Sequence, residues 1–374
     1  MKIKRVIFGV LIAFLIPAMI LRSKAVDTRE IEQVRNKQVL NSQDLQIIDD
    51  FLAQSVQELV KTRDFTTIAR TRTIILSNQS SQGQYAQQFS ESAHKYISLG
   101  FQQAKELAEE RQFKVILNLL ILVDGLKDPR LADLAIAHLK DNNKAIRYWA
   151  VRCVTNPGLI SKLNPSERDN LRLAQRIAEQ LGELVDSSEP EILALIAEFA
   201  AEVNIPEGQD LLLQIADTRI KRYADWTVKY ELLDSAILKL LYNKVISTSS
   251  NTPAVDSRKA GSLAGRFGQL YSYAMQRYLK GQDFLSNKNK HYLASVLVET
   301  EDKCIGKLLG RPQSTIRRAV EQKDYSLLLQ EHNRLLGDET REGQLALKLN
   351  FDYGTDPSGK KMVAPLTLPD PPKK

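Results

Sequence analysis

Apolar residues recur at intervals of three and four residues along almost the whole body of this chain. One such stripe runs through residues 47–60, another through 171–184 and a third through 232–241. These intervals match the 3.6-residue turn of an α-helix, whereas a strand with one buried face alternates every second residue. The pattern predicts an all-α body and argues against a fold built on sheets.

Helix start and stop signals are frequent, so the predicted helices are short, at about 10–20 residues. Proline follows Glu189, Ile205 and Arg311 as the first helical residue, and Gly337 follows Leu336 as a stop. Short helices with short connections pack as antiparallel neighbours. We therefore predict that the 374 residues form an α-solenoid, in which antiparallel helical hairpins stack one on the next.

A more specific motif lies in the middle of the chain. Asp141 stands in a polar turn, the pair Ile146 and Arg147 follows it, and Ala150 and Val154 come one and two turns later. This order resembles the second helix of a HEAT repeat. The resemblance implies that Ile146 and Val154 face the core, that Ala150 permits close helix approach, and that Asp141 and Arg147 link successive repeats.

Two weaker copies of the motif begin at Asp128 and at Glu189. Lys144 and Pro190 are 46 residues apart, within the period of about 40–47 residues of HEAT and armadillo units. The resemblance covers roughly residues 111–245. It implies an armadillo-type α-solenoid that serves as a non-catalytic scaffold.

The first 25 residues have the layout of a secretory signal. Three basic residues precede an uncharged apolar run, residues 6–21, and a small-x-small cleavage site ends at Ala25. Arg22 and Lys24 suit an uncleaved anchor equally well. Both interpretations place residues 26–374 outside the cytoplasm, in the periplasm or a similar space. The chain is then either cleaved after Ala25 or tethered by an N-terminal transmembrane helix. The alternative is that this segment is a buried helix of the fold.

Composition divides the exported part into four regions. We assign N-terminal helical hairpins to residues 26–110, HEAT-like repeats to 111–246, a basic helical region to 254–350 and a tail to 351–374. The polar run 247–253 reads as a linker between the second and third regions. These boundaries rest on composition and on helix signals alone.

The tail contains five prolines and two glycines in 24 residues, which prevents a regular helix. We expect it to be extended and disordered. Two alternatives remain open: a proline-rich docking segment, and a strand-like patch at residues 362–368.

The net charge of +7 comes from two local features on a nearly neutral body. The leader contributes +5, while residues 251–323 hold 13 basic against 6 acidic residues, interleaved with aromatic ones. Such a segment is typical of a solvated helix face, of a surface that binds an anionic membrane or an acidic protein, or of a nucleic-acid-binding site. Export of the chain argues against the nucleic-acid-binding site. The candidate partner-binding residues are Arg258, Lys259, Arg266, Arg277, Lys280, Lys288, Lys290, Arg311, Arg317 and Arg318.

No residue pattern points to catalysis, a cofactor or a metal. The four histidines lack metal-ligand spacing, and the glycines between Gly261 and Gly268 lack the Lys-Ser/Thr pair of a phosphate-binding loop. Cys153 and Cys304 lie too far apart in the sequence for a solenoid to bring them together easily. We therefore expect no catalytic residue, no cofactor and no metal ligand.

The functional prediction is an exported or membrane-tethered scaffold that binds a protein partner through a concave helical surface. One alternative is a binder of anionic lipid or polyanion through residues 251–323. The other is an envelope enzyme whose active-site cleft the sequence does not reveal.

Overall fold

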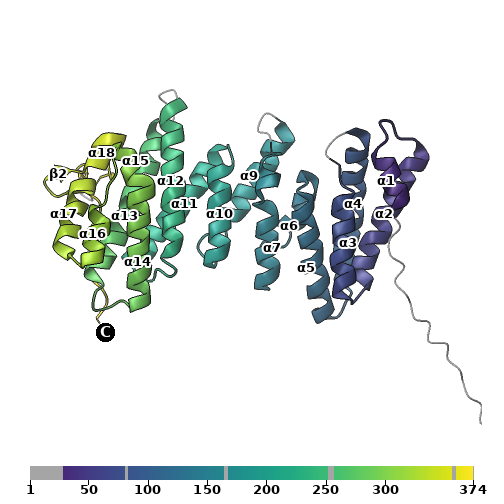
Figure 1. The fold of residues 1–374 in the computed structure, drawn as a ribbon, viewed down its shortest axis with the longest axis horizontal. Helices are drawn as coiled ribbons and strands as arrows, with labels where there is room; N and C mark the ends of the chain where they lie inside the picture. Colours follow the sequence, from purple (N-terminus) through teal and green to yellow (C-terminus); the bar gives the residue numbers. More distant parts are fainter. Residues whose placement is uncertain (1–27, 81–82, 164–166, 252–256, 356–358, 374) are drawn as a thin grey trace, which may run out of the picture. The chain divides into compact units, whose positions relative to one another are not determined.

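The computed structural model describes residues 28–80, 83–163, 167–251, 257–355 and 359–373 (Figure 1). Apart from a short β-hairpin and one isolated bridge, these residues form helices and their connections, which confirms the all-α prediction. Within these ranges, no helix combines the length and the apolar character needed to cross a bilayer. The predicted leader, residues 1–25, lies outside the described residues.

The chain divides into two compact units after Phe89. In the first unit, the side chain of Asn41 and that of Asp44 form a capping box at the start of the second helix, and Asp64 caps the third. These caps fix where the second and third helices begin, and the two helices pack on one another. The unit contains α1 (Arg29–Arg35), α2 (Ser42–Lys61), α3 (Phe65–Ser77) and the beginning of α4 (Gly83–Ala104).

The second unit is a two-layer array of helices. One layer consists of α5, α7, α10, α12 and α14, each packed on the next, and the other of α9, α11, α13 and α17. The helices of this unit are α5 (Glu109–Leu126), α6 (Ala132–Ile136), α7 (Lys144–Val154), α8 (Pro157–Ile160), α9 (Arg168–Gly182), α10 (Pro190–Glu202), α11 (Pro206–Ala224), α12 (Leu232–Asn251), α13 (Ser257–Lys280), α14 (Asn287–Thr300), α15 (Gly306–Leu309), α16 (Thr315–Gln322), α17 (Tyr325–Leu336) and α18 (Gln344–Leu349). A π-helical turn (Glu301–Ile305) precedes α15, and the hairpin of β1 (Gly337–Asp338) and β2 (Arg341–Glu342) precedes α18.

Successive helices of one layer begin at the spacing that the sequence predicted. Helix α7 begins at Lys144 and its neighbour α10 at Pro190, which is the 46-residue interval, and α12 follows at Leu232. The hairpins α10/α11 and α12/α13 join the two layers. The second unit is therefore an α-solenoid of helical hairpins.

Helix α7 buries the face that the repeat motif predicted. Ile146, Ala150 and Val154 are buried, and α7 packs on α5, α6 and α10. Ala150 has no accessible surface, in keeping with a close helix approach at this position. Cys153 lies on the same helix and its thiol donates to the Leu120 carbonyl oxygen of α5, at 3.1 Å.

Arg147 joins one repeat to the next. Its guanidinium donates to the main-chain carbonyl of Asp141 at 3.0 Å and to the Glu189 carboxylate at 3.2 Å. Glu189 is the residue before α10, so the contact spans one repeat. The Lys144 ammonium, and then the Arg147 guanidinium, lower the pKa of Glu189 to about 2. The predicted link is thus made by Arg147, while Asp141 contributes its main chain rather than its carboxylate.

The domain boundaries predicted from composition differ from the boundary between the two units that the packing defines. The structure divides after Phe89, inside α4, and places no division at residue 110 or 246. The first five residues of the expected linker, 247–251, belong to the end of α12.

Candidate functional site: a polypeptide-binding face on α13

Helix α13 carries a stripe of polar side chains in otherwise apolar surroundings. Gln269, Ser272, Gln276 and Lys280 stand at intervals of three, four and four residues, so they share one face of the helix. The first three are buried, although the helix around them is packed with leucine, tyrosine and phenylalanine. Buried polar groups need hydrogen-bond partners. Gln269 and Gln276 find them in the tail of the chain, and Ser272 finds them in His332 and Gln276.

The α13 stripe bonds the main chain of an extended tail segment. Leu366 donates its N–H to the Gln269 side chain at 2.8 Å, and its carbonyl accepts from Gln276 at 3.1 Å. Leu368 donates its N–H to Gln276 at 2.7 Å, and its carbonyl accepts from Lys280 at 2.6 Å. Both polar groups of two alternate residues are thus satisfied by side chains of one helix.

A strained loop completes this face. Trp226 and Tyr230 lie between α11 and α12 and have φ angles of +56° and +57°. Residues other than glycine rarely adopt this left-handed backbone conformation. The Arg219 guanidinium holds the loop by donating to the Lys229 carbonyl at 3.1 Å. From this position, the Trp226 indole N–H donates to the Pro369 carbonyl at 3.0 Å.

The prediction of a disordered tail is therefore wrong for residues 359–373. Leu368 has no accessible surface, Pro365 is buried, and Asp370 pairs with Lys280 at 2.9 Å. The tail has little regular secondary structure, as its prolines predicted, but its main chain is satisfied by α13 instead of by water. The segment docks on α13 of the same chain.

Two glycines allow the chain to come close to this region. Gly268 of α13 faces Tyr353: a Cβ atom at position 268 would lie 3.1 Å from the tyrosine ring. Gly337 faces the Val363 carbonyl, and a Cβ atom at position 337 would lie 2.7 Å from that oxygen. Gly337 also has a φ of +106°. Gly261, Gly265 and Gly268 are thus helical residues of α13, and Gly265 and Gly268 make room for the chain leading to the tail at Asp352 and Tyr353.

His332 supports the stripe from α17. Its Nε2 lies 2.8 Å from the Ser272 hydroxyl, and its Nδ1 lies 3.0 Å from the Asn333 side-chain oxygen. Because the Asn333 side-chain oxygen can only accept, the imidazole proton lies on Nδ1, and Nε2 accepts from the Ser272 hydroxyl. Burial lowers the pKa of His332, so this neutral form is the one that fits the network.

We expect the stability of the chain to fall below about pH 6.5, the unperturbed pKa of histidine. Below this pH the histidine of the unfolded chain takes up a proton, whereas buried His332 of the folded chain resists protonation. The free energy of unfolding therefore falls as the pH falls, by up to about 1.4 kcal/mol per pH unit. His332→Gln should reduce the loss of stability between pH 7.5 and 5.5, measured by urea unfolding. The exposed His291→Gln serves as the control, and an unchanged pH slope in His332→Gln would contradict this account.

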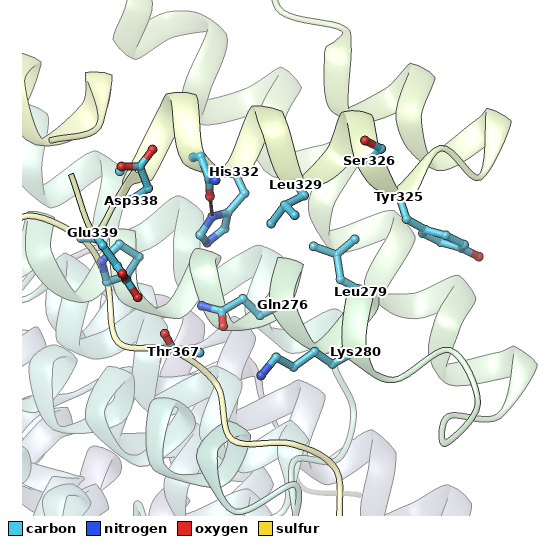
Figure 2. Close-up of a pocket in the computed structure, with 14 residues that line it drawn as sticks. Gln276, Leu279, Lys280, Tyr325, Ser326, Leu329, His332, Asp338, Glu339 and Thr367 are labelled. Carbon is cyan, nitrogen blue, oxygen red and sulfur yellow. Dashed lines mark hydrogen bonds between the residues drawn. The ribbon is translucent and has the colours of Figure 1, made fainter. Parts of the chain in front are cut away.

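An open cavity of about 680 Å³ lies beside the docked tail. Figure 2 shows Leu279 of α13 and Leu329 of α17 pointing toward one another across it, with Tyr325 at one end. The tail forms another wall through Ala364, Pro365 and Thr367. The face of α13 therefore has an occupied strip, along the tail, and an unfilled apolar strip next to it.

A buried charge cluster lies beneath this face. Arg219 forms a bidentate pair with Asp234 at 2.7 and 2.8 Å, and the Tyr223 hydroxyl donates to the same carboxylate at 2.7 Å. Arg277 lies over the Trp226 ring, 4.9 Å from its centroid, and pairs with Glu231 at 3.6 Å. The cluster fixes both ends of the loop that carries Trp226.

The structure describes eight of the ten basic side chains proposed from the sequence, and four of these eight are buried, ion-paired or part of the tail-binding stripe. Arg277 is buried and cannot reach a partner, so that prediction is wrong. Arg266 and Arg317 are paired with Asp217 and Asp302. Lys280 is the one residue of the ten that belongs to the tail-binding stripe among the described side chains. The side chains of Arg258 and Lys259 lie outside the described part, and Lys288, Lys290, Arg311 and Arg318 lie at the surface of α14, of α16 and of the turn before α16.

Sequence reasoning did not identify Gln269, Gln276 or Trp226. A signal was present in the spacing of three and four residues between polar side chains on an apolar helix, which is unusual for a buried face. In the described part of the chain, no group of three or more metal-ligand side chains is placed to hold an ion. Cys153 and Cys304 are both free and buried.

No protein-family model and no curated protein sequence matches the chain. Two solved structures of Kap121p, one bound to Pho4p and one bound to Nup53p, each share 13% identity with it at a TM-score of 0.37. Each match covers 82% of this chain and 33% of the other, so the chain spans about a third of the Kap121p it matches. An engineered protein matches with 12% identity and a TM-score of 0.22, over 88% of this chain and 97% of its own. The assignment as an α-solenoid rests on the packing of the chain itself.

Proposed function

We propose that this chain is a non-catalytic, protein-binding helical-repeat scaffold, and that the face of α13 holds an extended polypeptide. The observation that carries the proposal is the set of bonds from Gln269, Gln276 and Lys280 to the main chain of Leu366 and Leu368. Bonds to main-chain groups give affinity for any extended segment, while pockets for individual side chains add specificity. A face that holds one extended segment in this way is suited to hold another.

The rigidity of the face supports this proposal. All three side chains project from one helix that is packed on α11, α12, α14 and α17. Groups held on a packed helix are pre-organised, so little conformational entropy is lost when a peptide binds. The buried cluster and the Trp226 loop extend the rigid surface toward Pro369.

The test uses the full chain with Leu368→Asp, which expels its own tail, and a labelled peptide of residues 360–373. Fluorescence anisotropy should show saturable binding of the peptide. Gln276→Ala in the same chain should weaken it by about tenfold or more, because two hydrogen bonds worth about 1 kcal/mol each are lost. The exposed Gln330→Ala is the matched control. Absence of binding, or equal affinity in all three chains, would refute the proposed function.

We also propose that the scaffold acts outside the cytoplasm. The support is the basic and apolar pattern of residues 1–25 in the sequence. A fusion of residues 1–40 to a reporter that is active only after export should give a signal, and replacing Leu11 and Phe14 by aspartate should abolish it. A fusion that stays inactive would contradict the proposed location.

A further inference from the structure

We propose that the tail is a stand-in for a segment of a second protein, one that keeps the Leu-Pro-Asp order of residues 368–370 and has a large aliphatic or aromatic residue in place of Thr367. This inference rests on the proposed function and names the partner of the same site. Its basis is that the tail satisfies the polar stripe of α13 but leaves the adjoining cavity unfilled.

Three tail residues define what the occupied strip recognises. Leu368 is fully buried, which selects an aliphatic side chain. The Pro369 carbonyl accepts from the Trp226 indole at 3.0 Å, and the Asp370 carboxylate pairs with Lys280 at 2.9 Å. A proline favours the extended backbone before it binds, and a single acid matches the single ammonium. The partner is therefore an extended, proline-containing, acidic segment.

The cavity adds a requirement that the tail does not meet. Ala364, Pro365 and Thr367 line it, whereas Leu366 and Leu368 do not. Thr367 is exposed at the rim, while Leu279 and Leu329 form the apolar wall across from it (Figure 2). A leucine or phenylalanine at position 367 would bring apolar surface against that wall.

This unfilled space explains how a partner could displace a tethered tail. A segment held on the same chain has an effective concentration of about millimolar, so a partner with identical contacts would compete poorly. Burial of one additional leucine or phenylalanine raises affinity by about 10- to 100-fold. The partner's extra side chain would therefore overcome the advantage of tethering once the partner reaches about 10–100 μM, and the tail would hold the site below that concentration.

The experiment compares two peptides of residues 360–373, one native and one with Thr367→Leu. Both are titrated into the full chain carrying Leu368→Asp. The Thr367→Leu peptide should bind about 10- to 100-fold more tightly and should also displace the docked tail of the native chain. Leu329→Asp in the receptor should reduce this gain to less than about threefold, whereas the exposed Leu347→Asp of α18 should leave it intact.

The same substitution in the native chain gives a second readout that needs no released tail. Thr367→Leu in the full chain should slow tryptic cleavage after Lys361 by about 10- to 100-fold, because the tail then fills the cavity.

Three outcomes would overturn the proposal. If the native peptide binds but Thr367→Leu brings no gain in either measurement, the proposed function stands and the partner assignment falls. If neither peptide binds, the proposed function fails and this inference fails with it. If the native chain forms dimers by light scattering that Leu368→Asp abolishes, the occupant is the tail of a second copy.

Discussion

Replacing Asp234 by asparagine is expected to lower the free energy of unfolding by about 3–5 kcal/mol, since it leaves a buried charge without its counter-ion. Arg219 and Asp234 have exposed side-chain fractions of 2% and 0%. Asparagine keeps the shape of the aspartate but removes its charge, so Arg219 remains desolvated and uncompensated. The Tyr223 hydroxyl also loses its charged acceptor. Urea unfolding followed by circular dichroism measures the change.

The matched control is Asp217→Asn, which breaks the pair between Asp217 and Arg266. Both partners there are about half exposed, and exposed pairs contribute about 0–1 kcal/mol. The difference between the two variants isolates the effect of burial, because the chemical change is the same. A cost below about 1 kcal/mol in Asp234→Asn would show that the cluster beneath α13 is not essential to the fold.

Replacing Leu368 by aspartate is expected to release the tail from α13. The change removes an apolar contact worth about 2–3 kcal/mol and places a carboxylate where no water reaches. Because residues 364–373 can leave α13 without unfolding a helix, the molecule responds by undocking them rather than by burying the charge. Tryptic cleavage after Lys361 should then become at least about 100-fold faster than in the native chain.

Leu366→Asp is the control for this prediction. Leu366 carries the same side chain two residues earlier, and 49% of its surface is exposed. Aspartate is tolerated at such a position, and the main-chain bonds of Leu366 to Gln269 remain. Cleavage should therefore change by less than about threefold. Equal cleavage of Leu366→Asp, Leu368→Asp and the native chain would show that the tail does not depend on the Leu368 pocket.

The sequence was sufficient to predict the repeat fold because the signals involved are local. The intervals of three and four residues predicted helices, and the motif around Arg147 predicted the buried face of α7. The 46-residue interval from Lys144 to Pro190 predicted the step between neighbouring helices of one layer. Each of these depends on residues within one or two hairpins, so the sequence order carries the information directly.

The candidate site was not predictable in the same way, because its parts are far apart in the chain. Gln276 and Leu368 are 92 residues apart, and a proline-rich segment gives no sign of where its main-chain groups will be satisfied. The same reason applies to Arg277, which is basic and therefore expected at the surface. Its burial depends on Glu231 and on the ring of Trp226, both supplied by an earlier hairpin.

Amide hydrogen exchange resolved at individual residues tests most directly whether α13 holds the main chain of an extended segment. In the full native chain, the N–H groups of Leu366 and Leu368 donate to Gln269 and Gln276, while that of Thr367 points away from this stripe, as alternation requires. We expect both leucine amides to exchange at least about 100-fold more slowly than the Thr367 amide. Equally fast exchange at all three positions would contradict the central claim.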